Sequence, residues 1–153
     1  MGYQFTGFFA SADRSMLQDA QRAWPGCRTR DITAPFHGVG VAVPERALTY
    51  GEPKDAYARA IEMWHNIETE LPAWSRRYPS ALFVFLHADC WGSICYYKGY
   101  ACQDGAILER AADDEDEISG GDALRQLARH LGVELGDPPY FEPLARGYFE
   151  TSE

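Results

Sequence analysis

The densest group of chemically useful side chains is His87-Ala88-Asp89-Cys90, which places an imidazole, a carboxylate and a thiol close together. If a strand runs through residue 89, His87 and Asp89 lie on one face, where the carboxylate could orient the imidazole. A cysteine nucleophile also needs an electropositive surrounding that lowers its pKa. The sequence offers neither a neighbouring lysine nor a helix N-terminus there, so we predict a structural turn and no catalytic residues.

In an alternative interpretation, these residues form a catalytic or ligand-binding site. His87, Asp89 and Cys90, with His37 reaching across a loop, would then line the pocket of a small enzyme or ligand-binding domain. Alanine substitutions of His87 and Cys90 distinguish the two interpretations. They abolish activity if the group is a site, and they leave the binding of a protein partner nearly intact if it is not.

Sequence signatures of cofactor and metal chemistry are not found. A GxG pattern at residues 38–40 is of the dinucleotide-binding type, but a proline follows at 44, where that pattern requires a helix. We therefore predict no cofactor and no metal. We also expect thiols rather than disulfides, mostly in the core. The chain has four cysteines, none in a CxxC pair or at the tight spacing of zinc knuckles: Cys27, Cys90, Cys95 and Cys102.

Length and charge narrow the class of protein. The chain has 153 residues, 46% hydrophobic and 24% charged, which is the balance of one globular domain over residues 1–153. Its net charge is −9, and residues 113–117 are all acidic. No lysine and arginine cluster could neutralise nucleic-acid phosphates, so we expect a basic protein as the partner and no nucleic acid. Apolar runs are too short for a membrane helix and the N-terminus lacks a positive leader, which predicts a cytoplasmic protein.

The spacing of apolar residues predicts an α+β fold. Strands are expected at residues 3–10, 27–33 and 36–43, and an antiparallel meander at 80–110 is expected to form the centre of the sheet. Helical periodicity marks residues 16–24, 53–71 and 122–131, and Pro72 should end or kink the second helix near Leu71. We therefore predict an antiparallel sheet of about five strands with about three helices packed against it.

Aromatic residues exceed what such a core needs. Alternation places Tyr96 and Tyr100 on one strand face with Ile94, and it places Tyr97 on the other face, where we expect it to be exposed with Trp91 of the turn. The alternative is that helices cover both faces and bury every ring. Residues 140–149 are also rich in rings and must dock, either on the sheet or on another copy of the chain, which would make a homo-oligomer.

These observations favour an acidic protein-binding domain. The profile resembles, in size and composition, small bacterial immunity proteins, which neutralise toxins by capping them. That resemblance implies toxin neutralisation by direct binding and transfers no site residue. The rings would anchor a basic partner and the acidic loop would steer it. The predicted partner-binding residues are Trp91, Tyr97, Asp113, Asp114, Glu115, Asp116 and Glu117.

Overall fold

The computed structural model describes residues 2–44, 54–91, 94–114, 122–136, 139–145 and 147–149. Six antiparallel strands form one sheet in the order β2-β3-β1-β4-β5-β6. The predicted α+β fold is confirmed, and the predicted meander at 80–110 is β4-β5-β6; the sheet has six strands where about five were expected. The strands are β1 (Gly2–Ala10), β2 (Arg28–Ile32), β3 (Gly38–Ala42), β4 (Phe83–Trp91), β5 (Ile94–Gln103) and β6 (Ala106–Ala112).

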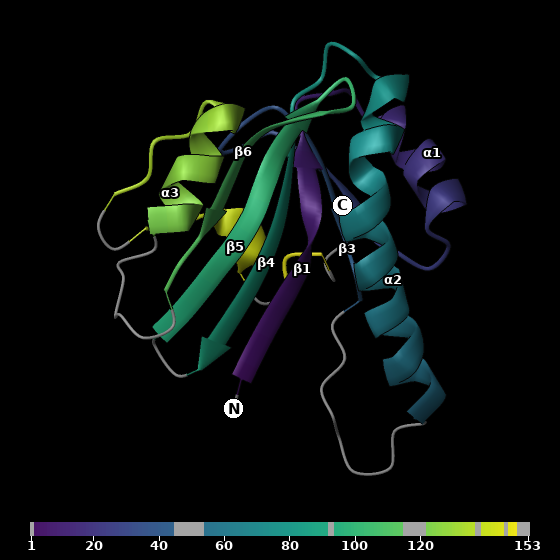
Figure 1. The fold of residues 1–153 in the computed structure, drawn as a ribbon, viewed down its shortest axis with the longest axis horizontal. Helices are drawn as coiled ribbons and strands as arrows, with labels where there is room; N and C mark the ends of the chain where they lie inside the picture. The colour runs from purple at the N-terminus through teal and green to yellow at the C-terminus, as the bar shows by residue number, and fades with distance from the viewer. Residues whose placement is uncertain are drawn as a thin grey trace.

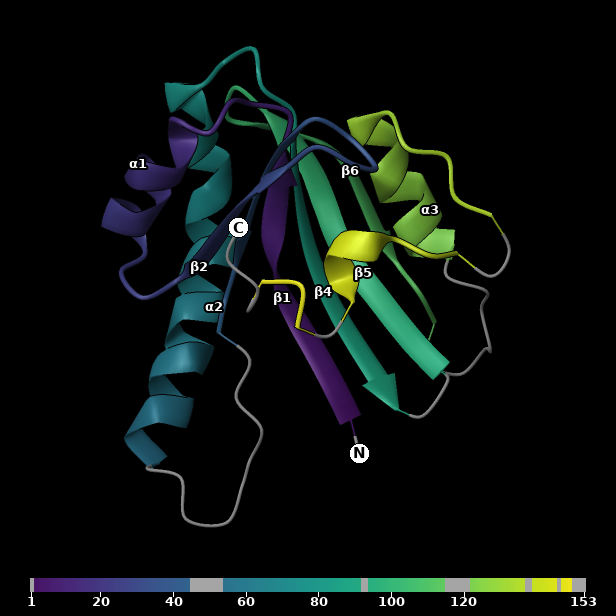
Figure 2. The same cartoon turned by 180° about the vertical axis from the view of Figure 1, so that it is seen from behind.

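Helices cover both faces of the sheet (Figures 1 and 2). One face, which we call the α2 face, carries α1 (Met16–Ala23) and α2 (Lys54–Trp74), followed by the short 3-10 helix η1 (Ser75–Arg77). The other, the α3 face, carries α3 (Asp122–Ala128), η2 (Arg129–Leu131) and the C-terminal segment with η3 (Glu142–Leu144). In the described part of the chain, no helix combines the length and the apolarity that crossing a membrane requires.

The α2 face is a continuous aromatic and aliphatic core. Phe83 and Phe85 of β4 are fully buried there, in the same cluster as Ile67 and Leu71 of α2. β4 is a central strand covered on both faces, and its residues 83–88 are all buried, as its continuous apolar run predicts. The strand therefore holds its alternate side chains in fixed positions on both faces.

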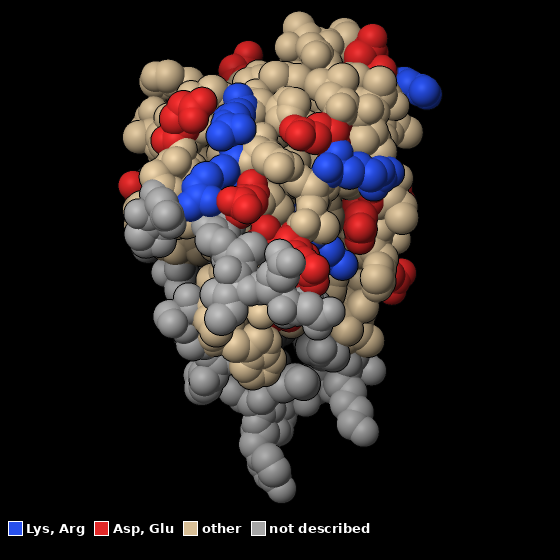
Figure 3. Space-filling model, turned by 60° about the vertical axis from the view of Figure 1, so that its left-hand side comes forward, with Lys and Arg blue, Asp and Glu red and all other residues tan. Residues whose placement is uncertain are grey.

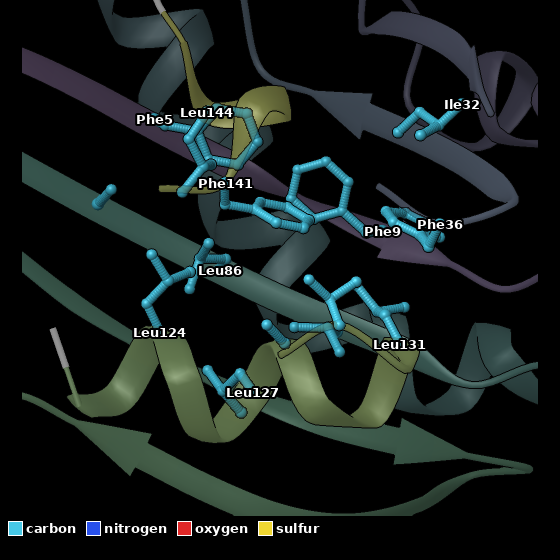
Figure 4. Close-up of a cluster of buried hydrophobic side chains, with 14 of the residues drawn as sticks. Phe5, Phe9, Ile32, Phe36, Leu86, Leu124, Leu127, Leu131, Phe141 and Leu144 are labelled. Carbon is cyan, nitrogen blue, oxygen red and sulfur yellow. The ribbon is translucent and has the colours of Figure 1, made fainter. Parts of the chain in front are cut away.

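The C-terminal segment packs on the α3 face of the sheet, next to α3. Figure 4 shows Leu124 and Leu127 of α3, Phe9 of β1 and the tail residues Phe141 and Leu144 gathered in one cluster. The ring of Phe141 lies 5.2 Å from that of Phe9, in an edge-to-face arrangement. The tail thus docks on its own sheet, which is one of the two outcomes that its ring content predicts. The homo-oligomer through this tail stays a prediction.

Two turns follow from residue types that tolerate a left-handed backbone. Asp104 and Gly105 join β5 to β6 with φ values of 50° and 83°, both positive as a type I′ turn requires. Gly132 follows η2 with φ at 79°, and so ends the helical segment that begins at Asp122. Both turns are confirmed where the sequence predicts them.

α2 does not end at Leu71. The expectation that Pro72 ends the helix there is therefore wrong. The helix continues to Trp74. A proline lacks the N–H that would bond to the carbonyl four residues earlier, which is that of Glu68. Tyr100 of β5 donates its hydroxyl to this carbonyl at 2.5 Å. The tertiary contact therefore supplies the hydrogen bond that the proline removes.

Replacing Tyr100 by phenylalanine is expected to lower the free energy of unfolding by about 1–2 kcal/mol, because the Glu68 carbonyl loses the hydroxyl that replaces its helical donor. In a Pro72→Ala background the restored N–H can donate to that carbonyl. Tyr100→Phe should then lower the free energy of unfolding by about 1 kcal/mol less than it does in the wild type. Urea unfolding of the four proteins in this cycle measures the coupling, with Tyr140→Phe as an exposed control. Equal costs in both backgrounds would show that the hydroxyl does not replace the helical donor.

Candidate functional site

The β4–β5 hairpin places several predicted site residues at one end of the sheet. Trp91 ends β4 and lies directly opposite Ile94, which begins β5. We call residues 89–91 and 94–96 the hairpin tip. Because alternate residues share a face, Asp89 and Trp91 lie on the α2 face together with His87, as predicted for a strand that runs through residue 89.

His87 lies at the boundary between the core and the tip, and is 7% exposed. Its Nδ1 is hydrogen-bonded to Oγ1 of Thr6 on β1 at 2.8 Å. The indole of Trp64 from α2 stacks on the imidazole, with ring centres 4.3 Å apart and an angle of 13° between the planes. The side chain is therefore held on three sides: by its own strand, by β1 and by α2.

Burial lowers the pKa of His87 to about 4, because the charged imidazolium would lose its hydration. The positive charge of Lys98, directly opposite on β5, lowers it further, whereas the carboxylate of Asp89 acts in the other direction. The imidazole is thus neutral at pH 7. Its geometry is that of a packed core histidine rather than of an open general base.

The tip exposes large apolar side chains. Trp91 is 62% exposed and Ile94 is 40% exposed, so two large apolar side chains face solvent from directly opposite positions. Asp89 is half-buried, and its Oδ1 atom is buried without a hydrogen-bond partner among the described residues. The tip therefore combines an exposed apolar pair with a carboxylate on the same face.

Cys90 and Cys95 lie opposite each other on the reverse side of the tip and form a disulfide. The expectation that these cysteines remain thiols is wrong. Spacing along the chain did not indicate the pairing, because it follows from the register of two antiparallel strands. Cys27 and Cys102 are buried thiols, as expected, and burial raises the pKa of each to about 11.

The alternative catalytic group is not assembled. Cys90 points to the face opposite His87 and Asp89, and its sulfur is bonded to Cys95. His37 is exposed and precedes β3 at Gly38, beside the Ala10 end of β1, whereas His87 pairs with Thr6 further along that strand. Imidazole, carboxylate and thiol therefore do not converge. Among the described residues, no group of three His, Cys, Asp or Glu side chains is placed to hold a metal ion.

The acidic run begins at the same end of the sheet as the hairpin tip. β6 ends where Ala112 pairs with Lys98, and the N–H of Asp113 then donates to the carbonyl of Tyr97 at 2.9 Å. Asp114 is exposed. The topology thus brings Asp113 and Asp114 to the end of the sheet that carries Trp91. The rest of the predicted acidic group, Glu115, Asp116 and Glu117, lies outside the described residues.

Two of the predicted binding residues have contacts inside the fold. The Asp113 carboxylate accepts hydrogen bonds at 3.0 Å from the N–H of Tyr97 and from the N–H of Ala123 in the first turn of α3. Tyr97 is only partly exposed, because its side chain packs against the core of the α3 face, and burial raises its pKa. Both residues therefore support the end of the sheet, and Trp91 and Ile94 form its exposed apolar part.

The side of the molecule with α3 and β6 carries acidic and basic side chains next to one another (Figure 3). Arg125 pairs with Asp122 at 2.8 Å, and His130 lies 2.7 Å from Glu109. A shallow cavity of about 240 Å³ lies there, between Glu109, Gln126, Arg129 and His130, and includes none of the predicted site residues. Charges of both signs therefore occur on the described part of this side.

Sequence reasoning did not single out three residues that shape the site. Ile94 was placed on the face of Tyr96 but not recognised as exposed, and Thr6 and Trp64 were not linked to His87. Alternation along β5 was the signal for Ile94, whereas the other two contacts join residues far apart in the chain and leave no local signal. No family model matches the chain, and no curated protein or solved structure matches it significantly.

Proposed function

We propose that the protein binds a basic protein partner through the hairpin tip. Trp91 and Ile94 would anchor the partner, and the acidic residues that begin at Asp113 would steer it into place. The observation that carries the proposal is the exposure of two large apolar side chains on directly opposite strands that a disulfide joins. Tryptophan is enriched among residues that dominate binding energy, because its ring buries much area at little entropic cost.

Charge supports the choice of a basic partner. The chain carries 23 acidic and 14 basic residues, and the acidic run starts at the end of the sheet that carries the tip. Opposite charge near an apolar anchor speeds association and fixes orientation more than it adds affinity. The proposal includes the role suggested by composition, which is neutralisation of a toxin by capping.

Replacing Trp91 by alanine is expected to weaken partner binding at least about 30-fold, which corresponds to about 2 kcal/mol. To test this, wild-type protein and the variant are each immobilised and incubated with an extract of the host. The proteins that each one retains are then quantified. Tyr140→Ala is the matched control, because Tyr140 is 69% exposed but belongs to the C-terminal segment. A stoichiometric basic partner kept by this control and lost by Trp91→Ala supports the proposal. A partner kept equally by both, or none at all, contradicts it.

A further inference from the structure

We infer that the Cys90–Cys95 disulfide is a thiol–disulfide exchange site, which a dithiol reductant opens while the rest of the fold persists, thereby loosening the hairpin tip. The two half-buried cysteines belong to neither buried core cluster. The other two cysteines, Cys27 and Cys102, are both buried within the α2-face core. A reductant can therefore approach the disulfide from solvent, and no further thiol competes for it.

The fold does not depend on this bond. The two cysteines are five residues apart, so the covalent loop is short and restricts the unfolded chain far less than a long-range disulfide would. The strands that it joins are held independently by their paired residues from Phe83–Cys102 to Trp91–Ile94 and by the cores on both faces. Opening the bond should thus affect the tip and leave the sheet in place.

The bond does have a local role at the tip. The Cα atoms of Cys90 and Cys95 are 4.0 Å apart, the close spacing of an antiparallel pair that exchanges no backbone hydrogen bonds. At this position only the side chains connect the strands. The outer pair, Trp91 and Ile94, has no further described pair beyond it, so it is the pair that loses most order when the sulfurs separate.

The exchange is a balanced two-electron reaction. A thiolate of the dithiol attacks one sulfur of the Cys90–Cys95 bond, which forms a mixed disulfide and releases the other cysteine as a thiolate that takes up a proton. The second thiol of the reductant, after losing its proton, attacks the mixed disulfide and releases the remaining cysteine. The protein gains two thiols, and the reductant leaves as its own disulfide.

The consequence for binding rests on the proposed function. With the disulfide formed, the apolar pair is held in one arrangement before the partner arrives, which lowers the entropy lost on binding. With the disulfide open, Trp91 and Ile94 must be ordered during association. Oxidised protein should therefore bind the basic partner more tightly than reduced protein, by about tenfold.

To test the exchange site, native protein is treated with dithiothreitol and then with iodoacetamide. Mass spectrometry then identifies the labelled cysteines. We expect labelling of Cys90 and Cys95 while Cys27 and Cys102 stay unlabelled. Hydrogen exchange at the amides of Trp91 and Ile94 should accelerate about tenfold, with residues 83–87 unchanged. Labelling of all four cysteines together, or none without denaturant, would overturn the inference, and so would unchanged exchange at the tip.

The double variant Cys90→Ser/Cys95→Ser is the matched control for the reductant. It should show fast exchange at the tip from the start and no response to dithiothreitol; a response would place the effect elsewhere and overturn the inference. Binding of the captured partner then separates the two proposals. Equal binding by oxidised and reduced protein overturns the redox dependence and leaves the binding function. Opening of the tip without any Trp91-dependent partner overturns the binding function and leaves the exchange site.

Discussion

Lowering the pH from 6.5 to 4 is expected to reduce the free energy of unfolding by about 2 kcal/mol through His87 alone. Burial lowers the pKa of His87 from 6.5 to about 4 in the folded protein, whereas the unfolded chain keeps the ordinary value. Between these two values the unfolded state binds a proton that the folded state does not. The contribution of neutral His87 to the free energy of unfolding is therefore fully present above pH 6.5, and it is lost as the pH falls to about 4.

The size of this effect follows from the difference between the two pKa values. That difference corresponds to about 3–4 kcal/mol at about 1.4 kcal/mol for each pKa unit, and we expect about 2 kcal/mol because remaining solvent contact screens part of the charge. Urea unfolding at a series of pH values measures it as the difference between wild type and His87→Gln, which cannot titrate. His37→Gln is the control at an exposed histidine. Parallel pH curves for wild type and His87→Gln would show that the imidazole is not buried in neutral form.

Replacing Gly99 by alanine is expected to lower the free energy of unfolding by about 3 kcal/mol or more. Gly99 of β5 pairs with Leu86 of β4. A methyl group there would overlap the backbone carbonyl oxygen of Phe85 and would lie 3.2 Å from Leu127 of α3. Neither backbone nor buried leucine can move aside without separating β4 from β5 or α3 from the sheet.

Gly136→Ala is the matched control for this substitution. A methyl group at Gly136 would meet no atom of the described residues within 4 Å. Denaturant unfolding should place Gly136→Ala within about 0.5 kcal/mol of wild type, as for an ordinary surface change. If Gly99→Ala were as stable as Gly136→Ala, Gly99 of β5 would not lie as close to the Phe85 carbonyl as the structure places it.

Local patterns carried enough information to predict most elements of the fold. The alternation of β1 and the apolar run of β4 follow from the two-residue period of strands, and α1 follows from the stripe that includes Met16 and Ala20. Asp104-Gly105 and Gly132 predict their turns, because those positions need positive φ. Pro72 shows where this reasoning fails. Its local effect is to end a helix, and a hydroxyl from β5, 32 positions from Glu68 in the chain, offsets that effect.

The candidate site was predicted only in its outline. The sequence predicted that Trp91 would be exposed and that Tyr96 would share a face with Ile94. It did not predict that Asp113 caps α3, because Asp113 precedes Ala123 by ten positions and no short-range capping pattern links them. Nor did it predict the disulfide, which forms because strand pairing places Cys90 opposite Cys95.

The sequence by itself therefore determined the periodic elements, the turns and the net negative charge of this protein, since each depends on residues that are neighbours in the chain. Tertiary structure alone decided the neutral state of His87, which is hydrogen-bonded to Thr6 across 81 positions. It also decided which rings are buried, and that the acidic run begins at the end of the sheet that carries the exposed Trp91–Ile94 pair. The physical reason is that burial and pairing depend on strand register and on which helix covers which face, and a one-residue change of register would exchange the two faces.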